Sequence, residues 1–209
     1  MKEPWSCEIF KSKFFLLFVF GQIFFFLGYI SMMVLLAPLL QFYGFSTSQI
    51  PNFLLILGCS ELVGRLVYAF VLIVKIDGVK LLMTTFILHG FGMALTFLCF
   101  IPNVNKSVVI VFSFAITGFA NGGFGGLMYK VLADYVAPSD YATAFSMQHI
   151  LSFGFGSTLG PLVGSGLVDL AANSDGVEPY WVAYVFGVAS TILAAGVVGL
   201  MIHLKKWHE

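Results

Sequence analysis

Long runs of apolar residues, separated by short polar breaks, follow one another along the chain. Six of them are long enough to cross the hydrocarbon core of a bilayer, which takes about 20 residues in a helix. They cover Phe14–Tyr43, Phe53–Val74, Leu81–Ile101, Val108–Tyr129, Ala142–Val168 and Val182–Leu204. The breaks contain turn residues such as Gly44, Pro102 and Pro138. Because the runs are continuous rather than alternating, the pattern predicts helices and not the strands of a barrel.

Composition agrees with a chain that lies in lipid. It is 59% apolar and 10% charged, whereas a soluble domain has about 25% charged residues. We therefore predict an all-α membrane protein with one six-helix transmembrane domain over residues 14–204. Residues 1–13 form a terminal segment before it and residues 205–209 a tail after it. The first run exceeds the core of a signal peptide, so we expect it to stay as a helix.

The lysines give the predicted orientation. One side of the predicted topology carries Lys2, Lys11, Lys13, Lys75, Lys80, Lys130, Lys205 and Lys206. The other side has only Lys106, together with Asp169, Asp175 and Glu178. Basic residues concentrate in cytosolic loops, so both termini are predicted to be cytosolic. Basic and acidic residues are equal in number, so no overall charge indicates a nucleic-acid partner.

The second run contains two charged residues near its middle, Glu61 and Arg65. One such charge at the bilayer centre costs at least about 2.5–3.5 kcal/mol on insertion scales. Residues four apart share a helix face, so the two can partly neutralise each other. One interpretation is a binding site in which Arg65 meets a carboxylate and Glu61 changes its protonation or its partner. The other is a permanent ion pair that fixes helix packing.

Three further residues form a stripe on the fourth run: Asn121, Gly125 and Tyr129. They either line a cavity or hydrogen-bond a neighbouring helix. His89 and His149 also lie within runs, and for both we favour a hydrogen bond between helices over a proton relay.

Glycines recur at a spacing of four in two of the runs. The repeats are Gly118, Gly122 and Gly126 in the fourth run and Gly156, Gly160 and Gly164 in the fifth. Small residues on one face let helix backbones approach closely, so these stripes predict tight packing. We also expect a bend around Gly160 and Pro161.

Other chemistry has little support in the sequence. The three cysteines are scattered, without the spacing of a metal site, and we expect neither a disulfide nor a metal ion nor a cofactor. The chain has no phosphate-binding glycine loop, no zinc-protease motif and no nucleophile elbow. These observations argue against an enzyme.

The chain resembles the monocarboxylate transporter family over nearly its whole length. The passage from Gly44-Phe45-Ser46 through residues 53–58 to Glu61-Leu62-Val63-Gly64-Arg65 resembles that family's seventh and eighth helices. The stretch from Gly118-Phe119 through Val131-Leu132-Ala133-Asp134, Ala144-Phe145 and residues 160–164 to Asp169 is similar to the tenth and eleventh helices.

This resemblance implies the C-terminal half of a major facilitator fold, built from two inverted three-helix repeats. It assigns carboxylate binding to Arg65 and proton coupling to Glu61, where the family often has aspartate. Asn121 and Gly125 fall on two further cavity positions, at which better-known members have phenylalanine and serine. The first six helices of the family have no counterpart here. A second transporter half or a single-span accessory glycoprotein is an expected partner.

The leading hypothesis is a secondary transporter, or half of one, that moves a small carboxylate or related metabolite by alternating access, with proton coupling as an open point. The plasma membrane is the expected location by family resemblance. The alternative is a truncated, non-transporting membrane protein that associates with transporter subunits. A half-size channel built as a homodimer is a third hypothesis, weakened because the intramembrane charge is confined to one pair.

Overall fold

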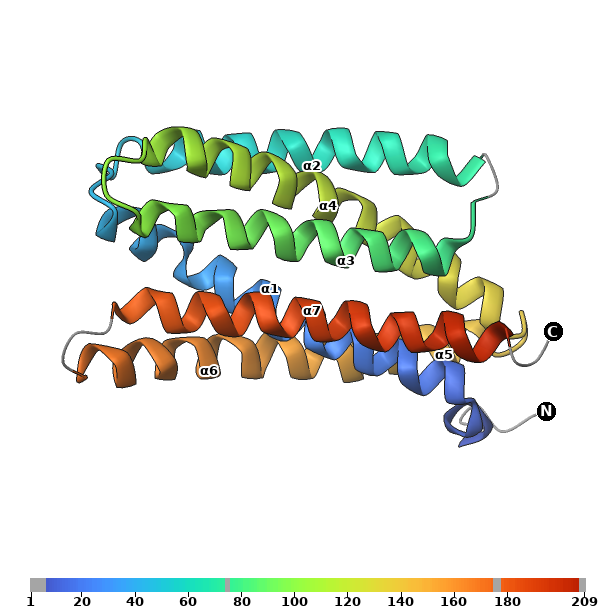
Figure 1. Cartoon of the computed structure of the whole chain (residues 1–209). Helices are drawn as coiled ribbons and strands as arrows, with labels where there is room; N and C mark the ends of the chain where they lie inside the picture. Colours follow the sequence, from blue (N-terminus) through green and yellow to red (C-terminus); the bar gives the residue numbers. More distant parts are fainter. Residues whose placement is uncertain (1–6, 74–75, 175–177, 207–209) are drawn as a thin grey trace.

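A computed structural model describes residues 7–73, 76–174 and 178–206 of the chain. The predictions made for Lys2, Lys75 and Asp175 lie outside these residues. Within them the chain forms helices and loops and no strand (Figure 1). The elements are η1 (Cys7–Lys11), α1 (Lys13–Phe42), α2 (Ile50–Ile73), α3 (Gly78–Leu95), η2 (Thr96–Phe100), α4 (Lys106–Tyr135), α5 (Tyr141–Gln148), η3 (His149–Gly154), α6 (Phe155–Ala172) and α7 (Pro179–Lys206).

These elements make six helices that are long and apolar enough to cross a membrane. The spans are Lys13–Phe42, Ile50–Leu72, Gly78–Phe100, Lys106–Tyr135, Tyr141–Ala172 and Pro179–Leu204. The 3-10 helix η2 completes the third span, and the fifth consists of α5, the π-helical segment η3 and α6. The prediction of an all-α, multi-pass membrane protein with six spans is confirmed.

Several helix ends differ from the predicted ones, most of all the end of α4. Helix α4 continues six residues beyond the predicted end at Tyr129 and finishes at Tyr135. Lys130 pairs with Asp134 one turn later, so charged residues outside the apolar run still support the helix. Helix α7 continues through Lys206, so the predicted tail 205–209 begins inside a helix. At the start of the first span, the Ser12 hydroxyl caps α1 by accepting a hydrogen bond from the Phe15 amide over 3.3 Å.

The helices pack in a pattern that repeats within the chain. Helix α1 packs against α6 and α7, and α4 packs against α2 and α3. Helices α3 and α7 also pack against each other (Figure 1). If the first three spans are exchanged for the last three, so that α1 replaces α4, α2 replaces the fifth span and α3 replaces α7, these five pairs map onto one another. The packing of α6 against α7 has no comparable counterpart between α2 and α3.

Glycines set the closest of these contacts. A Cβ atom added at Gly118 or Gly122 of α4 would lie 2.2 Å from the Leu57 carbonyl oxygen or 2.1 Å from that of Glu61, both on α2. The glycines of the fifth span, Gly156, Gly160 and Gly164, face residues of α1 in the same way. These contacts confirm the tight packing predicted for the stripes, with the exception of Gly126, which has no atom within 4 Å of an added Cβ.

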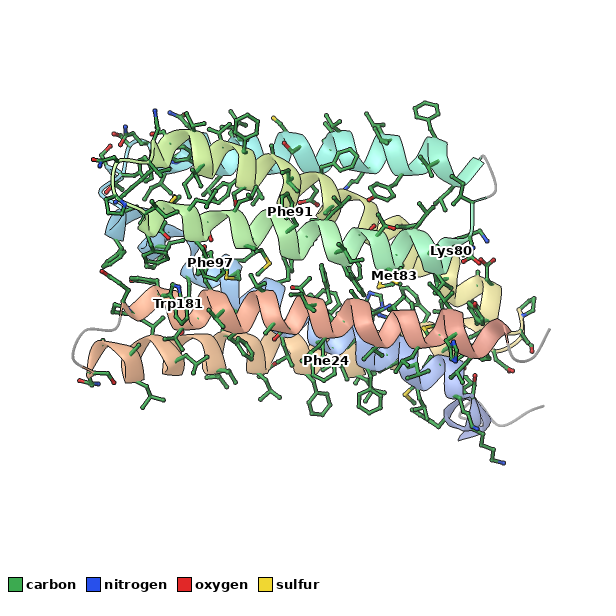
Figure 2. All side chains as sticks on the ribbon, in the orientation of Figure 1. Phe24, Lys80, Met83, Phe91, Phe97 and Trp181 are labelled. Carbon is green, nitrogen blue, oxygen red and sulfur yellow. The ribbon has the colours of Figure 1, made fainter. Side chains whose placement is uncertain are left out.

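Aromatic rings separate α1 from α4, where the backbones are farther apart. Phe25 of α1 lies 4.4 Å from Phe124 of α4 and 4.8 Å from Phe86 of α3, measured between ring centroids. Phe25 and Phe86 are fully buried. Figure 2 shows apolar side chains along the outside of the bundle, among them the exposed Phe91, while Lys80 lies at one end. This distribution suits a bundle whose outer surface meets lipid.

Candidate functional site

The charged pair lies at the middle of α2. Glu61 is the central residue of the span Ile50–Leu72, and Nη2 of Arg65 donates a hydrogen bond to Oε1 of Glu61 one turn away. The side chain of Arg65 is 66% exposed, against 22% for Glu61. Most of the Arg65 side chain is therefore accessible from outside the bundle, where it can meet a second group.

Helix α2 is placed so that one face is covered and another is open. The covered face lies on Gly118 and Gly122 of α4. The open face forms a groove of about 310 Å³ lined by Gly58, Glu61, Leu62 and Arg65. That volume is at the lower end of the range of small-molecule sites, about 300–1,000 Å³. A small carboxylate fits a groove of this size, where it would meet an arginine.

Tyr29 joins this site from α1, which the sequence did not predict. The Asn121 amide Nδ2 donates a hydrogen bond to the Tyr29 hydroxyl over 3.2 Å. Asn121 precedes Gly122, against which the backbone of Glu61 and Arg65 packs, so Tyr29 contacts the part of α4 that lies next to the pair. The sequence did contain one indication of this role: Tyr29 carries a phenol within the first run, most of which is apolar.

The other two predicted residues of the α4 stripe lie further along the helix. An added Cβ at Gly125 would meet no atom within 4 Å, so this glycine borders open space. Tyr129 is 43% exposed and packs on rings of the fifth span, with centroid distances of 5.4 Å to Phe145 and 6.4 Å to His149. The structure therefore pairs Glu61 with Arg65, places Asn121 next to Gly122, against which the backbone of the pair packs, and places Tyr129 in a separate aromatic contact.

The prediction for the two histidines is wrong. His89 is 1% exposed, and neither ring nitrogen has a hydrogen-bond partner among the described residues. Its neighbours are the rings of Phe25 and Tyr29, at centroid distances of 5.0 and 5.5 Å, which offer faces and edges rather than acceptors. His149 forms a hydrogen bond with Gln148, its neighbour in sequence, over 3.1 Å, and this bond does not link two helices.

A buried amide cluster was also missed. Gln148 donates from Nε2 to Oε1 of Gln22 on α1, and the Ser152 hydroxyl donates to the same oxygen over 3.1 Å. All three side chains are fully buried. Gln148 directly precedes the π-helical segment η3 and Ser152 lies within it, so this polar contact fixes α1 to the irregular part of the fifth span.

Comparison with known proteins assigns no family. No family model matches the chain, and no curated protein matches its sequence. Among the described residues there is no group of three or more His, Cys, Asp and Glu side chains that could hold a metal ion. The chemistry of the site therefore rests on its own residues: an exposed guanidinium, an acid one turn away, and an amide held by a phenol.

Proposed function

We propose that this chain is a six-helix half of a secondary transporter that moves a small carboxylate or related metabolite across a membrane by alternating access. The observation behind this proposal is the mid-membrane arginine whose side chain is 66% exposed although an acid lies one turn away. A purely structural pair would be expected to bury both partners. An arginine that keeps donors accessible is suited to binding a planar carboxylate through two parallel hydrogen bonds.

Glu61 is proposed as the proton-coupling residue. Glu61 and the substrate carboxylate compete for the same guanidinium, because Arg65 is the cationic partner of Glu61 in the absence of substrate. When Arg65 turns to the substrate, Glu61 loses its counter-charge inside the membrane, and uptake of a proton relieves that cost. Substrate and proton would then be bound together. Asn121, held by Tyr29, and Gly125 line the approach to the pair, and Tyr129 contributes further along α4.

The packing pattern supports the proposed architecture. Inverted three-helix repeats produce equivalent contacts in the two triplets of a half. Five helix pairs of this bundle map onto one another when the triplets are exchanged, although the contact of α6 with α7 has no comparable counterpart. In a twelve-helix transporter of this type the groove on α2 would face a second half, either another chain or a further part of the same protein. A single-span accessory glycoprotein is a second proposed partner.

The proposed orientation places both termini in the cytosol of a plasma-membrane protein. Helix α1 begins and α7 ends at the same end of the bundle (Figure 1), and Lys11, Lys13, Lys80 and Lys130 belong to this end. The excess of lysine there supports a cytosolic position. Impermeant thiol reagents tested on Ser48→Cys and Ser139→Cys, in intact and in opened cells, would report the sides of two loops at opposite ends.

Uptake by proteoliposomes tests the function. Arg65→Lys keeps the charge but removes the planar pair of donors, so we expect carboxylate uptake to fall by about ten-fold or more. Lys130→Arg is the matched control, because Lys130 and Asp134 form the same kind of one-turn pair near the end of α4. Uptake should be unchanged in this control. Unchanged uptake in Arg65→Lys would remove Arg65 from the site.

The second candidate is a non-transporting protein that associates with transporter subunits. It is favoured by the apolar side chains that α2 exposes beside the pair, among them Leu55, Leu62 and Phe70 at 64%, 60% and 68%. The variant Leu62→Cys places a thiol on this face, and cross-linking from it would show whether the face meets another helix. Native Cys59 is the comparison, because it lies in a separate groove toward α3 and α4. Association without uptake by either partner would favour this candidate over a transporter.

A further inference from the structure

Beyond the charged pair, the side of α4 that faces α2 continues to Tyr129. Gly122 on this side packs against the backbone of Glu61 and Arg65. Seven residues make almost two full turns of a helix, so Tyr129 lies within about 20° of the direction of Gly122 and about 10 Å further along the axis. A long side chain on a helix leans back toward the N-terminus. The ring of Tyr129 therefore leans toward the level of the pair.

Two glycines leave open space between the pair and this ring. They are Gly125 and Gly126, which follow Gly122 by about one turn, and a Cβ added at either would meet no atom within 4 Å. At Gly118 and Gly122 an added Cβ would instead collide with the backbone of α2. The glycines of α4 that meet α2 thus all precede Gly125, and the described residues leave the next turn of this face uncovered.

A cluster of aromatic rings from two spans lies at the far end of this space. Phe145 of the fifth span is at its centre, with its ring centroid 5.4 Å from that of Tyr129, 4.3 Å from that of His149 and 6.2 Å from that of Tyr141. Tyr129 is exposed and the other three are half-buried. The ring cluster is therefore not sealed inside the bundle, and its most accessible member is the one next to the glycines.

The two ends of the open space offer different contacts to a ligand. Aromatic rings bind a further ring in offset or edge-to-face geometry, with centroids about 4.5–7 Å apart, and such contacts add to the effect of apolar burial. Glycines beside Tyr129 leave room for that ring, whereas larger side chains would fill the space. At the other end, the exposed side chain of Arg65 offers donors to a carboxylate.

We infer that the substrate is an aryl carboxylate, whose carboxylate binds Arg65 and whose ring lies over Gly125 and Gly126 against the ring of Tyr129. A short linker between carboxylate and ring is sufficient for the separation of about 10 Å along α4, because the ring contact itself extends over about 4.5–7 Å. The inference rests on the proposed function for the role of Arg65. It adds a substrate class, and it assigns recognition of the aryl group to Tyr129 with Phe145 behind it.

The experiment compares three radiolabelled acids, 3-phenylpropanoate, 3-cyclohexylpropanoate and butanoate, in equilibrium binding and in proteoliposome uptake by the full chain. The first two share the carboxylate and the linker and differ in the aromaticity of the ring, while the third has no ring. We expect the phenyl acid to bind about two- to ten-fold more tightly than the cyclohexyl acid, as for one aromatic contact. Equal binding of these two acids, or tighter binding of butanoate, would overturn the inference.

Three variants locate the contact. Tyr129→Leu removes the ring and should abolish the preference for the phenyl acid, while Phe91→Leu, which removes an exposed ring on the outside of the bundle (Figure 2), should keep it. Gly126→Leu fills the open space and should weaken the phenyl acid by about ten-fold while butanoate still binds. A preference that survives both Tyr129→Leu and Gly126→Leu would also overturn the inference. The three acids on the unmodified chain decide the question even where a variant does not fold.

The two readouts separate this inference from the proposed function. A preference for the phenyl acid in binding, without uptake of any acid, would reject transport and support the aryl site. Uptake with no preference among the acids would support transport and reject the aryl site. Binding of none of the three acids would reject both.

Discussion

The side-chain amide of Asn121 donates a hydrogen bond to the hydroxyl of Tyr29 over 3.2 Å. The bond connects two helices through residues that are 92 positions apart in the chain. The contact joins α4 to α1, which aromatic rings otherwise hold apart. It lies next to Gly122, against which the backbone of Glu61 and Arg65 packs. The orientation of an amide at the candidate site is therefore set by a residue from the opposite side of the bundle.

The strength of this contact can be measured by a double-mutant cycle. Tyr29→Phe and Asn121→Leu each remove one partner, and we expect a coupling free energy of about 0.6 kcal/mol, with an upper bound near 1.7 kcal/mol, as for other hydrogen bonds between membrane helices. Reversible unfolding of the two single variants and the double variant in detergent gives the value. A coupling of zero would mean that the two side chains act independently.

Replacement of Glu61 tests proton coupling separately from binding. Glu61→Gln removes the exchangeable charge but keeps the size of the side chain, so Arg65 stays available to the substrate. We expect carboxylate exchange to persist, while an imposed pH gradient no longer drives accumulation. The measurement is proteoliposome uptake with and without the gradient. Gradient-driven accumulation equal to that of the wild type would exclude Glu61 as the coupling residue.

The glycine contact beneath the charged pair predicts a position-specific loss of stability. An alanine at Gly122 would place its Cβ 2.1 Å from the Glu61 carbonyl oxygen, and backbone has little room to move there. Gly122→Ala should therefore lower the free energy of unfolding by about 1–3 kcal/mol. Gly126→Ala, one turn later on the same stripe, meets no atom within 4 Å and should be neutral or slightly stabilising. Equal effects at both positions would contradict the packing described.

The amide cluster predicts a second loss of stability. Gln22→Leu removes the oxygen that accepts from both Gln148 and Ser152 and leaves buried polar groups without it. We expect a loss of about 1–3 kcal/mol in the free energy of unfolding. Gln41→Leu is the control on the same helix, because Gln41 is exposed near the end of α1. If the two variants unfold at the same denaturant concentration, the cluster does not stabilise the bundle.

Hydropathy was sufficient to predict the six spans because lipid demands long apolar helices, and this demand is visible in the order of the residues alone. The same information is insufficient where partners come from distant parts of the chain. Tyr29 was missed as the partner of Asn121, and His89 was expected to have a hydrogen bond although aromatic rings surround it.

The glycine stripe of α4 shows the same limit within a single motif. Gly118, Gly122 and Gly126 have the same spacing, yet only the first two meet α2. Where two helices diverge depends on the packing of the entire bundle. Residue spacing predicts which face is small, but it does not predict how far along the helix that face is covered.

The π-helical segment η3 has a consequence for the register of the fifth span. Gln148 before it, Ser152 within it and Gly156, Gly160 and Gly164 after it all contact α1, although steps of four residues drift around a helix of 3.6 residues per turn. One wide turn, with bonds from i to i+5, offsets this drift. If the same residues wound as a regular α-helix, Gln148 would be rotated out of phase with the glycines. The polar and small-residue contacts with α1 are thus kept on one face by an irregularity in the helix that carries them.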